Sequence, residues 1–221
     1  MRSLVLVTAG LSTPSTTRQL GDALVDATTA HISARGEGVD VTVIELRDLA
    51  AELADAMTNW TAATPQLDAA KRALSTADGL IAVTPVFQGS YSGLFKMFFD
   101  TLEPDALDEL PTMIAATGGS SRHALVLDYA LRPLLSYLHA VVVPTGIFQA
   151  TEDFGTVEGE RTRQRITRAA RQLADGMVTP TDRVAGMNGA DEQPRRTGLD
   201  VEEDFVPFNQ LLHGHNGETK D

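Results

Sequence analysis

Residues 84–96 combine aromatic rings, hydroxyls and glycines in one short stretch, which reads Thr-Pro-Val-Phe-Gln-Gly-Ser-Tyr-Ser-Gly-Leu-Phe-Lys. Phe87 and Tyr91 offer ring faces, and Gly89 permits a close approach of the backbone. This combination predicts a site for a flat ligand. The alternative is a tight connection in an ordinary α/β domain.

Residues 9–18 form a second stretch rich in hydroxyls, Ala-Gly-Leu-Ser-Thr-Pro-Ser-Thr-Thr-Arg. It contains neither G-x-G-x-x-G nor a Walker lysine, so neither pyrophosphate motif applies. Hydroxyl side chains at a predicted helix N-terminus, where backbone N–H groups are free, suit a terminal phosphate monoester. A hydroxyl-rich helix cap that binds no ligand is the alternative.

Residues 117–123, Thr-Gly-Gly-Ser-Ser-Arg-His, form a third stretch. Gly118 and Gly119 can bring backbone N–H groups close to the edge of a planar ligand. His123 could contact a substrate and Arg122 a nucleotide phosphate. A structural histidine at the start of a helix and a solvated arginine are the plainer interpretations.

Apolar runs and helical periodicity place these three stretches in an alternating pattern of strands and helices. The predicted strands are residues 4–7, 39–46, 79–84, 112–117 and 141–144. The predicted helices are residues 15–35, 67–77, 92–102, 124–139 and 157–176, with a further helical turn at 48–57. We expect Pro85 to end the third strand and Ser92 to cap the helix that follows.

Five strands that alternate with helices predict an α/β fold, a doubly wound five-stranded parallel sheet with helices on both faces, in the flavodoxin-like order. Ligands of such sheets bind outside the carboxyl ends of the strands, at the switch point. The three stretches follow the first, third and fourth predicted strands, so we expect them to meet at one edge. A ligand with a phosphate at one end and a flat, hydrogen-bonding ring at the other is FMN.

The composition is that of a soluble chain with one core domain. The 221 residues are 43% hydrophobic, and no apolar run approaches the ~20 residues that cross a membrane. A formal net charge of −12 argues against a nucleic-acid partner. Since the chain has no cysteine, redox chemistry requires a bound cofactor, and the absence of a secretory signal predicts a cytoplasmic location.

Residues 178–221 differ in character from the predicted domain, residues 1–177. Glycine and proline interrupt the periodicity and acidic residues outnumber basic ones, which predicts a flexible tail. Residues 205–212, Phe-Val-Pro-Phe-Asn-Gln-Leu-Leu, are apolar enough to dock on the domain or on a neighbouring subunit. His213 and His215 could bind a metal, although two histidines in such a tail make a poor site.

The chain resembles the NAD(P)H-dependent FMN reductase family of flavodoxin-like proteins, and within it the reductase components of two-component flavin-dependent monooxygenases. The resemblance is carried by residues 84–100, by 117–120 with His123, by 128–135 (Asp-Tyr-Ala-Leu-Arg-Pro-Leu-Leu) and more loosely by 12–17. It implies FMN as the cofactor, NADH or NADPH as the co-substrate, and a monooxygenase as a recipient of reduced flavin.

The resemblance also assigns parts of the flavin to the three stretches. It implies the phosphate at residues 12–17, the ribityl chain and isoalloxazine at 85–91, and the remaining ring edge at 117–120. Thr16 stands where relatives often have arginine, which implies looser phosphate binding. The expected cofactor-binding residues are Ser12, Ser15, Thr16, Thr17, Pro85, Val86, Phe87, Gly89, Ser90, Tyr91, Thr117, Gly118, Gly119 and Ser120.

The implied reaction is hydride transfer from a nicotinamide to FMN, for which the protein orients both rings and supplies backbone donors. This chemistry requires no general acid, so no catalytic acid or base is assigned. The alternatives are an FMN-containing quinone, azo-dye or metal-ion reductase, and a flavodoxin-type electron carrier.

Two predicted helices could make contacts outside the flavin site. Residues 92–102 are apolar on more than one face, so we expect the second face to join subunits of a homodimer or homotetramer. A deep core position is the alternative. The arginines between residues 161 and 171 favour a solvated helix face over a site for the 2′-phosphate of NADPH.

Overall fold

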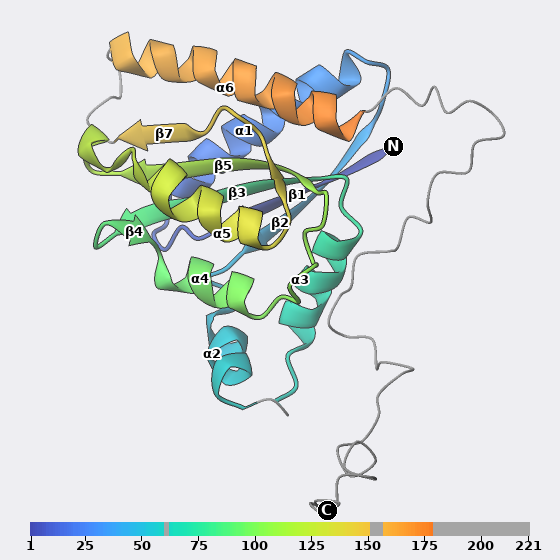
Figure 1. Ribbon diagram of the computed structural model, residues 1–221, viewed down its shortest axis with the longest axis vertical. Coiled ribbons are helices and arrows are strands. Elements are labelled where there is room, and N and C mark those ends of the chain that lie inside the picture. Colours follow the sequence, from blue (N-terminus) through green and yellow to red (C-terminus); the bar gives the residue numbers. More distant parts are fainter. Residues whose placement is uncertain (60–61, 151–156, 179–221) are drawn as a thin grey trace, which may run out of the picture.

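The computed structural model describes residues 1–59, 62–150 and 157–178 (Figure 1). Its sheet has the order β2-β1-β3-β5-β6, and every pair along this path is parallel. The strands of this path are β1 (Arg2–Thr8), β2 (Val39–Glu45), β3 (Gly79–Phe87), β5 (Pro111–Gly118) and β6 (Val141–Val142). This is the flavodoxin-like order, so the predicted fold class is confirmed.

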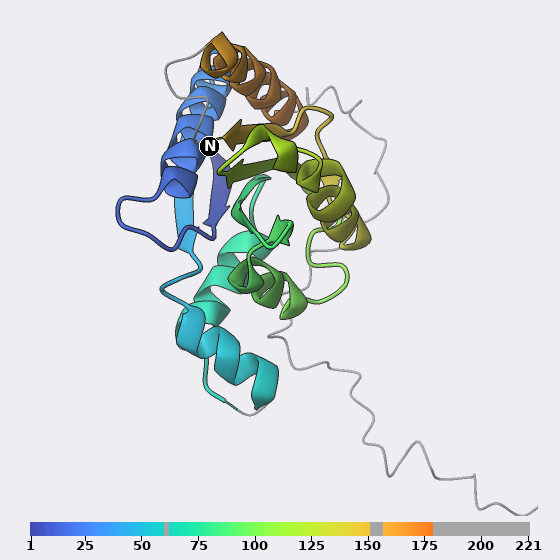
Figure 2. The ribbon, with the colours of Figure 1, turned by 90° about the vertical axis from the view of Figure 1, so that its left-hand side faces the viewer.

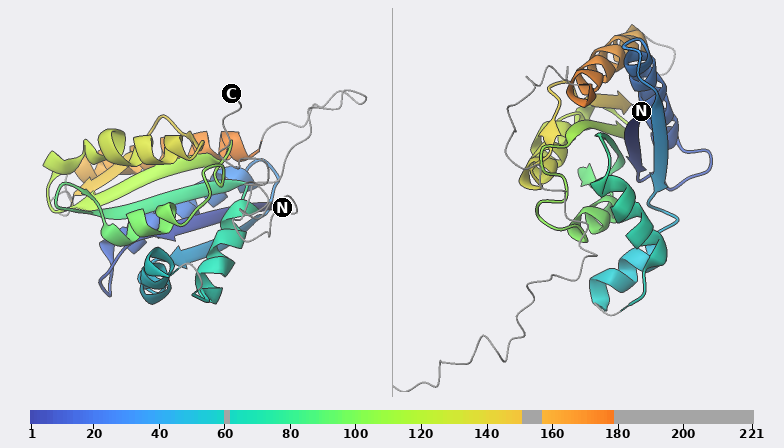
Figure 3. Two further views of the ribbon diagram at one scale, coloured as in Figure 1. Left: turned by 60° about the horizontal axis from the view of Figure 1, so that its bottom comes forward. Right: turned by 90° about the vertical axis from the view of Figure 1, so that its right-hand side faces the viewer.

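The sheet has seven strands, not the predicted five. β4 (Ser90–Tyr91) pairs antiparallel with β3, and β7 (Ile147–Ala150) pairs parallel with β5. Of the predicted strand 141–144, only Val141–Val142 form a strand, β6. The chain then leaves the sheet and returns at residues 147–150 as β7, which the sequence pattern does not predict. The N-terminus lies at the opposite end of the sheet from the β4 hairpin (Figure 3).

β3 continues past Pro85, so the predicted end of this strand is wrong. The backbone stays extended to Phe87 and returns as β4 through Gln88 and Gly89, whose φ angles are 50° and 80°. Positive φ at both central residues is the geometry of a two-residue hairpin turn. The antiparallel partner keeps the strand extended beyond the proline, which itself lies opposite Thr117 of β5.

Helices cover both faces of the sheet (Figure 2). Side chains of β1 alternate between the two faces: Leu4 and Leu6 belong to one core cluster, and Val5 and Val7 to the other. The first cluster is completed by α1 (Thr16–Ser33) and α6 (Val157–Met177), and the second by α2 (Ala50–Thr58), α3 (Pro65–Ser75), α4 (Gly93–Asp100) and α5 (Arg132–Tyr137). Among the described residues, no helix is both long and apolar enough to cross a bilayer.

The predicted helix over residues 124–139 is irregular. A 3₁₀ turn (Ser121–His123) is followed by a π-helix (Leu127–Leu131), and α5 begins only at Arg132. Pro133 lies in the first turn of α5 and has no N–H to donate. The N–H of Arg132 bonds to the carbonyl of Leu127, five residues back, so the helix is widened just before the proline.

The phenylalanines of α4 belong to the core of the single chain. Phe95, Phe98 and Phe99 are all buried, so the deep core position is correct for them and the expected interface is wrong there. Leu94 and Met97 of the same helix are only partly buried. Ser92 caps α4 as predicted, because its Oγ accepts a hydrogen bond from the N–H of Phe95 at 3.3 Å.

The last described helix, α6, completes the core. Met177 is buried and packs so closely on Gly79 that a Cβ added to this glycine would lie 2.5 Å from the methionine sulfur. α6 ends at Met177, and the domain boundary at residue 177 stays a prediction. The predicted docking segment, residues 205–212, and both tail histidines lie outside the described residues.

Candidate functional site

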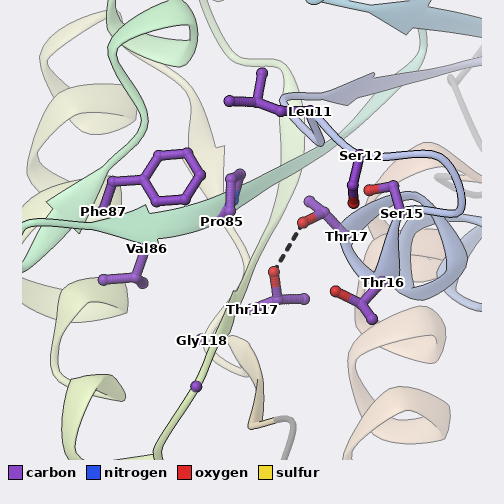
Figure 4. Close-up of a pocket in the computed structure, with 11 residues that line it drawn as sticks. Leu11, Ser12, Ser15, Thr16, Thr17, Pro85, Val86, Phe87, Thr117 and Gly118 are labelled. Carbon is purple, nitrogen blue, oxygen red and sulfur yellow. Dashed lines mark hydrogen bonds between the residues drawn. The ribbon is translucent and has the colours of Figure 1, made fainter.

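A cavity of about 330 Å³ opens at the carboxyl edge of the sheet (Figure 4). Three segments line it: the loop after β1 with the start of α1, the end of β3, and the end of β5. These are the three stretches that the sequence singles out, and the structure brings them together. The lining residues are Leu11, Ser12, Ser15, Thr16, Thr17, Pro85, Val86, Phe87, Thr117, Gly118 and Gly119.

The polar end of the cavity is the N-terminus of α1. Ser15 is the N-cap, and its Oγ accepts a hydrogen bond from the N–H of Arg18 at 3.2 Å. The first N–H groups of a helix have no partner within the helix and carry partial positive charge. Gly10 leaves room for the cap, since a Cβ there would lie 2.0 Å from Ser15 Oγ. Together with the hydroxyls of Ser12 and Thr16, this end suits an anion.

Arg18 directs its charge away from the cavity. Its Nε donates to Asp22 Oδ1 at 2.7 Å, and its Nη1 contacts Glu45. The hydrogen bond to Asp22 raises the pKa of Arg18 above its ordinary value, although desolvation opposes the shift. Within the described residues, no lysine or arginine lines the cavity. Amides and hydroxyls therefore provide its attraction for an anion.

One hydrogen bond joins two walls of the cavity. Thr17, in the first turn of α1, and Thr117, near the end of β5, lie with their Oγ1 atoms 2.8 Å apart. Both side chains are buried, and Figure 4 shows them pointing toward one another between the helix and the strand. The bond sets the distance between the polar end of the cavity and the strand that leads to Gly118.

The side of the cavity opposite the hydroxyls is apolar. Pro85, Val86 and Phe87 line it from β3 (Figure 4). The Phe87 side chain is 46% exposed and that of Leu11, on the loop after β1, is 51% exposed. Apolar side chains that stay open to solvent at a cavity mouth can cover one face of a flat ring while leaving the other accessible.

Two adjacent glycines at the end of β5 have different surroundings. A Cβ on Gly118 would lie 2.9 Å from Cζ of Phe148, which belongs to β7, so this position admits only glycine without a shift of the ring. A Cβ on Gly119 would meet no atom within 4 Å. The open space beside Gly119 is therefore available to a ligand.

Four of the expected cofactor-binding residues lie outside the lining. Gly89 and Ser90 belong to the β3–β4 hairpin. The Tyr91 ring packs on Phe95 with centroids 5.8 Å apart. Ser120 caps the 3₁₀ turn, where its Oγ accepts from the N–H of the next residue but one at 3.4 Å. Their contacts with FMN stay predictions.

Sequence reasoning missed Leu11. A single leucine between a glycine and a serine carries no pattern that separates it from an ordinary surface residue, and only the loop geometry places it at the cavity. Arg122 and His123, the candidate contacts for a nucleotide phosphate and a substrate, are exposed and outside the lining. Among the described residues, no group of three or more histidine or acidic side chains is arranged to hold a metal ion.

Residues 1–155 match the family described as NADPH-dependent FMN reductase. The chain belongs to this family. The NADH-dependent FMN reductase SfnF of Pseudomonas fluorescens is 38% identical over 173 residues, which are 77% of this chain and 89% of the relative. The matched residues contain all three segments of the cavity.

Solved structures agree with this membership. The crystal structure of an oxidoreductase from Corynebacterium diphtheriae is 58% identical, with a TM-score of 0.78, and the match covers 80% of this chain and 97% of that one. The apo form of the NADH:FMN oxidoreductase EmoB is 27% identical, with a TM-score of 0.70 over 90% of this chain and 96% of that one. The matched fold thus spans nearly the full length of both solved structures.

Proposed function

We propose that this protein is an NAD(P)H-dependent FMN reductase and that FMN binds in the cavity at the carboxyl edge of the sheet. The observation that carries the proposal is the meeting of an anion-binding helix end, an apolar wall and a glycine edge around one cavity. Membership of the FMN reductase family supports it.

The residues of the cavity fit FMN in size and chemistry. A volume of about 330 Å³ lies within the roughly 300–1,000 Å³ that small-molecule and cofactor sites occupy. Ser12, Ser15 and Thr16 at the N-terminus of α1 would hold the phosphate. The wall that contains Phe87 would hold the ring, and the open side of Gly119 would accept its edge.

FMN, when bound, supplies a ring that accepts a hydride from a nicotinamide. The chain's own residues bind and orient the two partners. Backbone donors near Gly119 would lie where negative charge develops, and donors that are already in place cost no reorganisation during the reaction. The half-exposed Phe87 leaves the mouth open for the nicotinamide. No acid or base is needed among the lining residues.

We propose further that the protein is a homodimer or homotetramer. Four large apolar or aromatic side chains, Leu125, Tyr129, Tyr137 and Val141, are exposed on the segment that runs from the 3₁₀ turn to β6. Exposed side chains of this kind are typical of protein contact surfaces. Size-exclusion chromatography with light scattering tests the proposal, and a monomer at micromolar concentration would contradict it.

A flavin-dependent monooxygenase in the cytoplasm is the proposed recipient of the reduced flavin. Such transfer requires FMN to leave the site, and the open mouth is consistent with exchange. Desalting of the FMN-loaded protein distinguishes exchange from permanent retention: flavin that separates from the protein supports transfer, and flavin that stays bound favours a quinone, azo-dye or metal-ion reductase.

Steady-state oxidation of NADH and of NADPH, each with and without added FMN, tests the main proposal. We expect oxidation that depends on FMN with at least one nucleotide. A carrier of the flavodoxin type would bind FMN but oxidise neither nucleotide. If neither nucleotide is oxidised with FMN, quinone, azo-dye or ferric acceptors, the reductase assignment is wrong.

A further inference from the structure

The loop between β1 and α1 has little packing of its own. Leu11, Ser12, Thr13 and Pro14 are all exposed, although the loop forms the polar end of the cavity. Within the loop, Ser12 Oγ donates to the carbonyl of Pro14 at 2.9 Å. An exposed loop without apolar burial needs polar contacts from elsewhere to keep one conformation.

Arg47 supplies such contacts from the residues that follow β2. Its Nη1 donates to Thr13 Oγ1 at 2.7 Å and to the carbonyl of Ser12 at 3.3 Å. The two acceptors belong to neighbouring residues, so one guanidinium nitrogen fixes both the backbone and a side chain of the loop. The Arg47 side chain is itself only 32% exposed.

Glu45 holds Arg47 in place. Its Oε2 lies 2.9 Å from Arg47 Nε, and its Oε1 contacts Arg18 at the start of α1. Arg18 in turn bonds Asp22 one turn further along the helix. The end of β2, the loop and the first turns of α1 are therefore tied into a single cluster of side chains.

The cluster that contains Arg47 holds more negative than positive charges. Two arginines, Arg18 and Arg47, face three carboxylates, those of Asp22, Glu45 and Asp48. The cluster adds no net positive charge to the polar end of the cavity. What Arg47 adds is orientation, because it holds Ser12 and Thr13 beside the amides of α1 before a ligand arrives.

We propose that Arg47 is a positioning residue that holds residues 11–14 in the conformation that receives the phosphate of the flavin, and so sets the preference for FMN over riboflavin. This inference rests on the proposed function. Riboflavin has the same ring without the phosphate, so a residue that acts on the phosphate end alone affects one ligand and spares the other.

Flavin-binding titrations of the full-length apoprotein with FMN and with riboflavin test the proposal. The variant Arg47→Met keeps the length of the side chain and removes every donor. We expect it to raise the Kd for FMN about tenfold, which corresponds to ~1.4 kcal/mol, and the Kd for riboflavin less than about twofold. Arg72→Met, on the exposed side of α3, is the matched control and should change neither.

Two further variants separate orientation from a general loss of structure. Thr13→Val removes the hydroxyl that accepts the hydrogen bond from Arg47 and leaves Arg47 intact. It should therefore raise the Kd for FMN, as Arg47→Met does, but only about threefold. Arg47→Lys keeps a charge but replaces the planar fork by a point donor, and should give an intermediate Kd.

The outcomes are distinguishable. If Arg47→Met weakens the binding of FMN and of riboflavin equally, or weakens neither, the proposed role of Arg47 is wrong. The proposed reductase function is unaffected by either result. Wild-type protein that binds neither flavin overturns the proposed function and this inference with it.

Discussion

Thr17 and Thr117 are hydrogen-bonded through their hydroxyls at 2.8 Å, although 100 residues separate them in the chain. The bond connects the first turn of α1 with the end of β5 inside the wall of the cavity. Both residues are almost fully buried, Thr17 at 3% and Thr117 at 6% exposed. A buried pair of this kind stabilises the fold only while both members are present.

We therefore expect Thr17→Val and Thr117→Val each to lower the free energy of unfolding by roughly 1–3 kcal/mol, because each leaves a buried hydroxyl unpaired. The double variant should lose less than the sum of the two. Urea unfolding measures all three values. Additive losses would show that the two hydroxyls do not depend on each other.

Thr17→Val and Thr117→Val should also weaken the binding of FMN, because the hydrogen bond between the two threonines sets the width of the cavity. Thr28→Val provides the control. Thr28 is buried in the same helix, where its Oγ1 donates to the carbonyl of Leu24 at 2.8 Å, away from the cavity. Its replacement should lower stability and leave the Kd for FMN unchanged.

Substitutions at Gly118 and Gly119 distinguish an effect on folding stability from an effect on FMN binding. Gly118→Ala brings a Cβ to 2.9 Å from Phe148, so we expect a loss of roughly 1–3 kcal/mol in unfolding free energy. Gly119→Ala meets no atom of the chain within 4 Å and should leave stability unchanged. If the flavin edge lies against Gly119, the added methyl should raise the Kd for FMN about tenfold. An unchanged Kd would place the ring elsewhere.

Much of the fold could be predicted from the sequence, because its determinants are local. The apolar run before Thr84 and the hydroxyl-rich helix start at Ser15 each carry their own signal. Their positions in a doubly wound sheet then bring the loops to one edge. Ten of the fourteen expected flavin contacts accordingly line one cavity.

The features that the sequence did not predict depend on contacts between residues from different segments of the chain. Proline has no N–H to donate and so predicts the end of a strand at Pro85, but the pairing of Val86 with Tyr91 keeps the backbone extended. That same pairing turns Tyr91 onto Phe95, outside the cavity lining. Arg47, 34 residues from Thr13 in the chain, could not be connected with the loop before the sheet order was known.

Phe87 provides a test of the apolar wall. Phe87 is 46% exposed, so about half of its apolar surface is buried, and Phe87→Ala should lower the unfolding free energy by roughly 1 kcal/mol. If the Phe87 ring covers part of the flavin, Phe87→Ala should raise the Kd for FMN and the Kd for riboflavin equally, by roughly threefold to tenfold. This distinguishes Phe87 from Arg47, for which only FMN should be affected. Met57→Ala, which shortens an apolar side chain of α2 that is also 46% exposed and lies outside the lining, is the control.

Lys71 of α3 provides a test of electrostatics away from the site. Burial lowers the pKa of its ammonium below the ordinary 10.5, and the nearby carboxylates of Asp68 and Glu103 only partly oppose this shift. The unfolded chain therefore binds this proton more tightly than the folded chain. The resulting loss of stability is fully present below the folded pKa and disappears as the pH rises toward 10.5.

Lys71→Met should accordingly stabilise the protein at pH 7, by no more than about 0.5 kcal/mol because the side chain is only half-buried and solvent screens its charge. The gain over wild type should shrink as the pH approaches 10.5, where the wild-type lysine is neutral in the folded state. Thermal unfolding at several pH values measures this difference. Arg72→Met removes a neighbouring exposed charge of the same helix and should show no such pH dependence, and a gain for Lys71→Met that grows with pH would contradict the assigned cause.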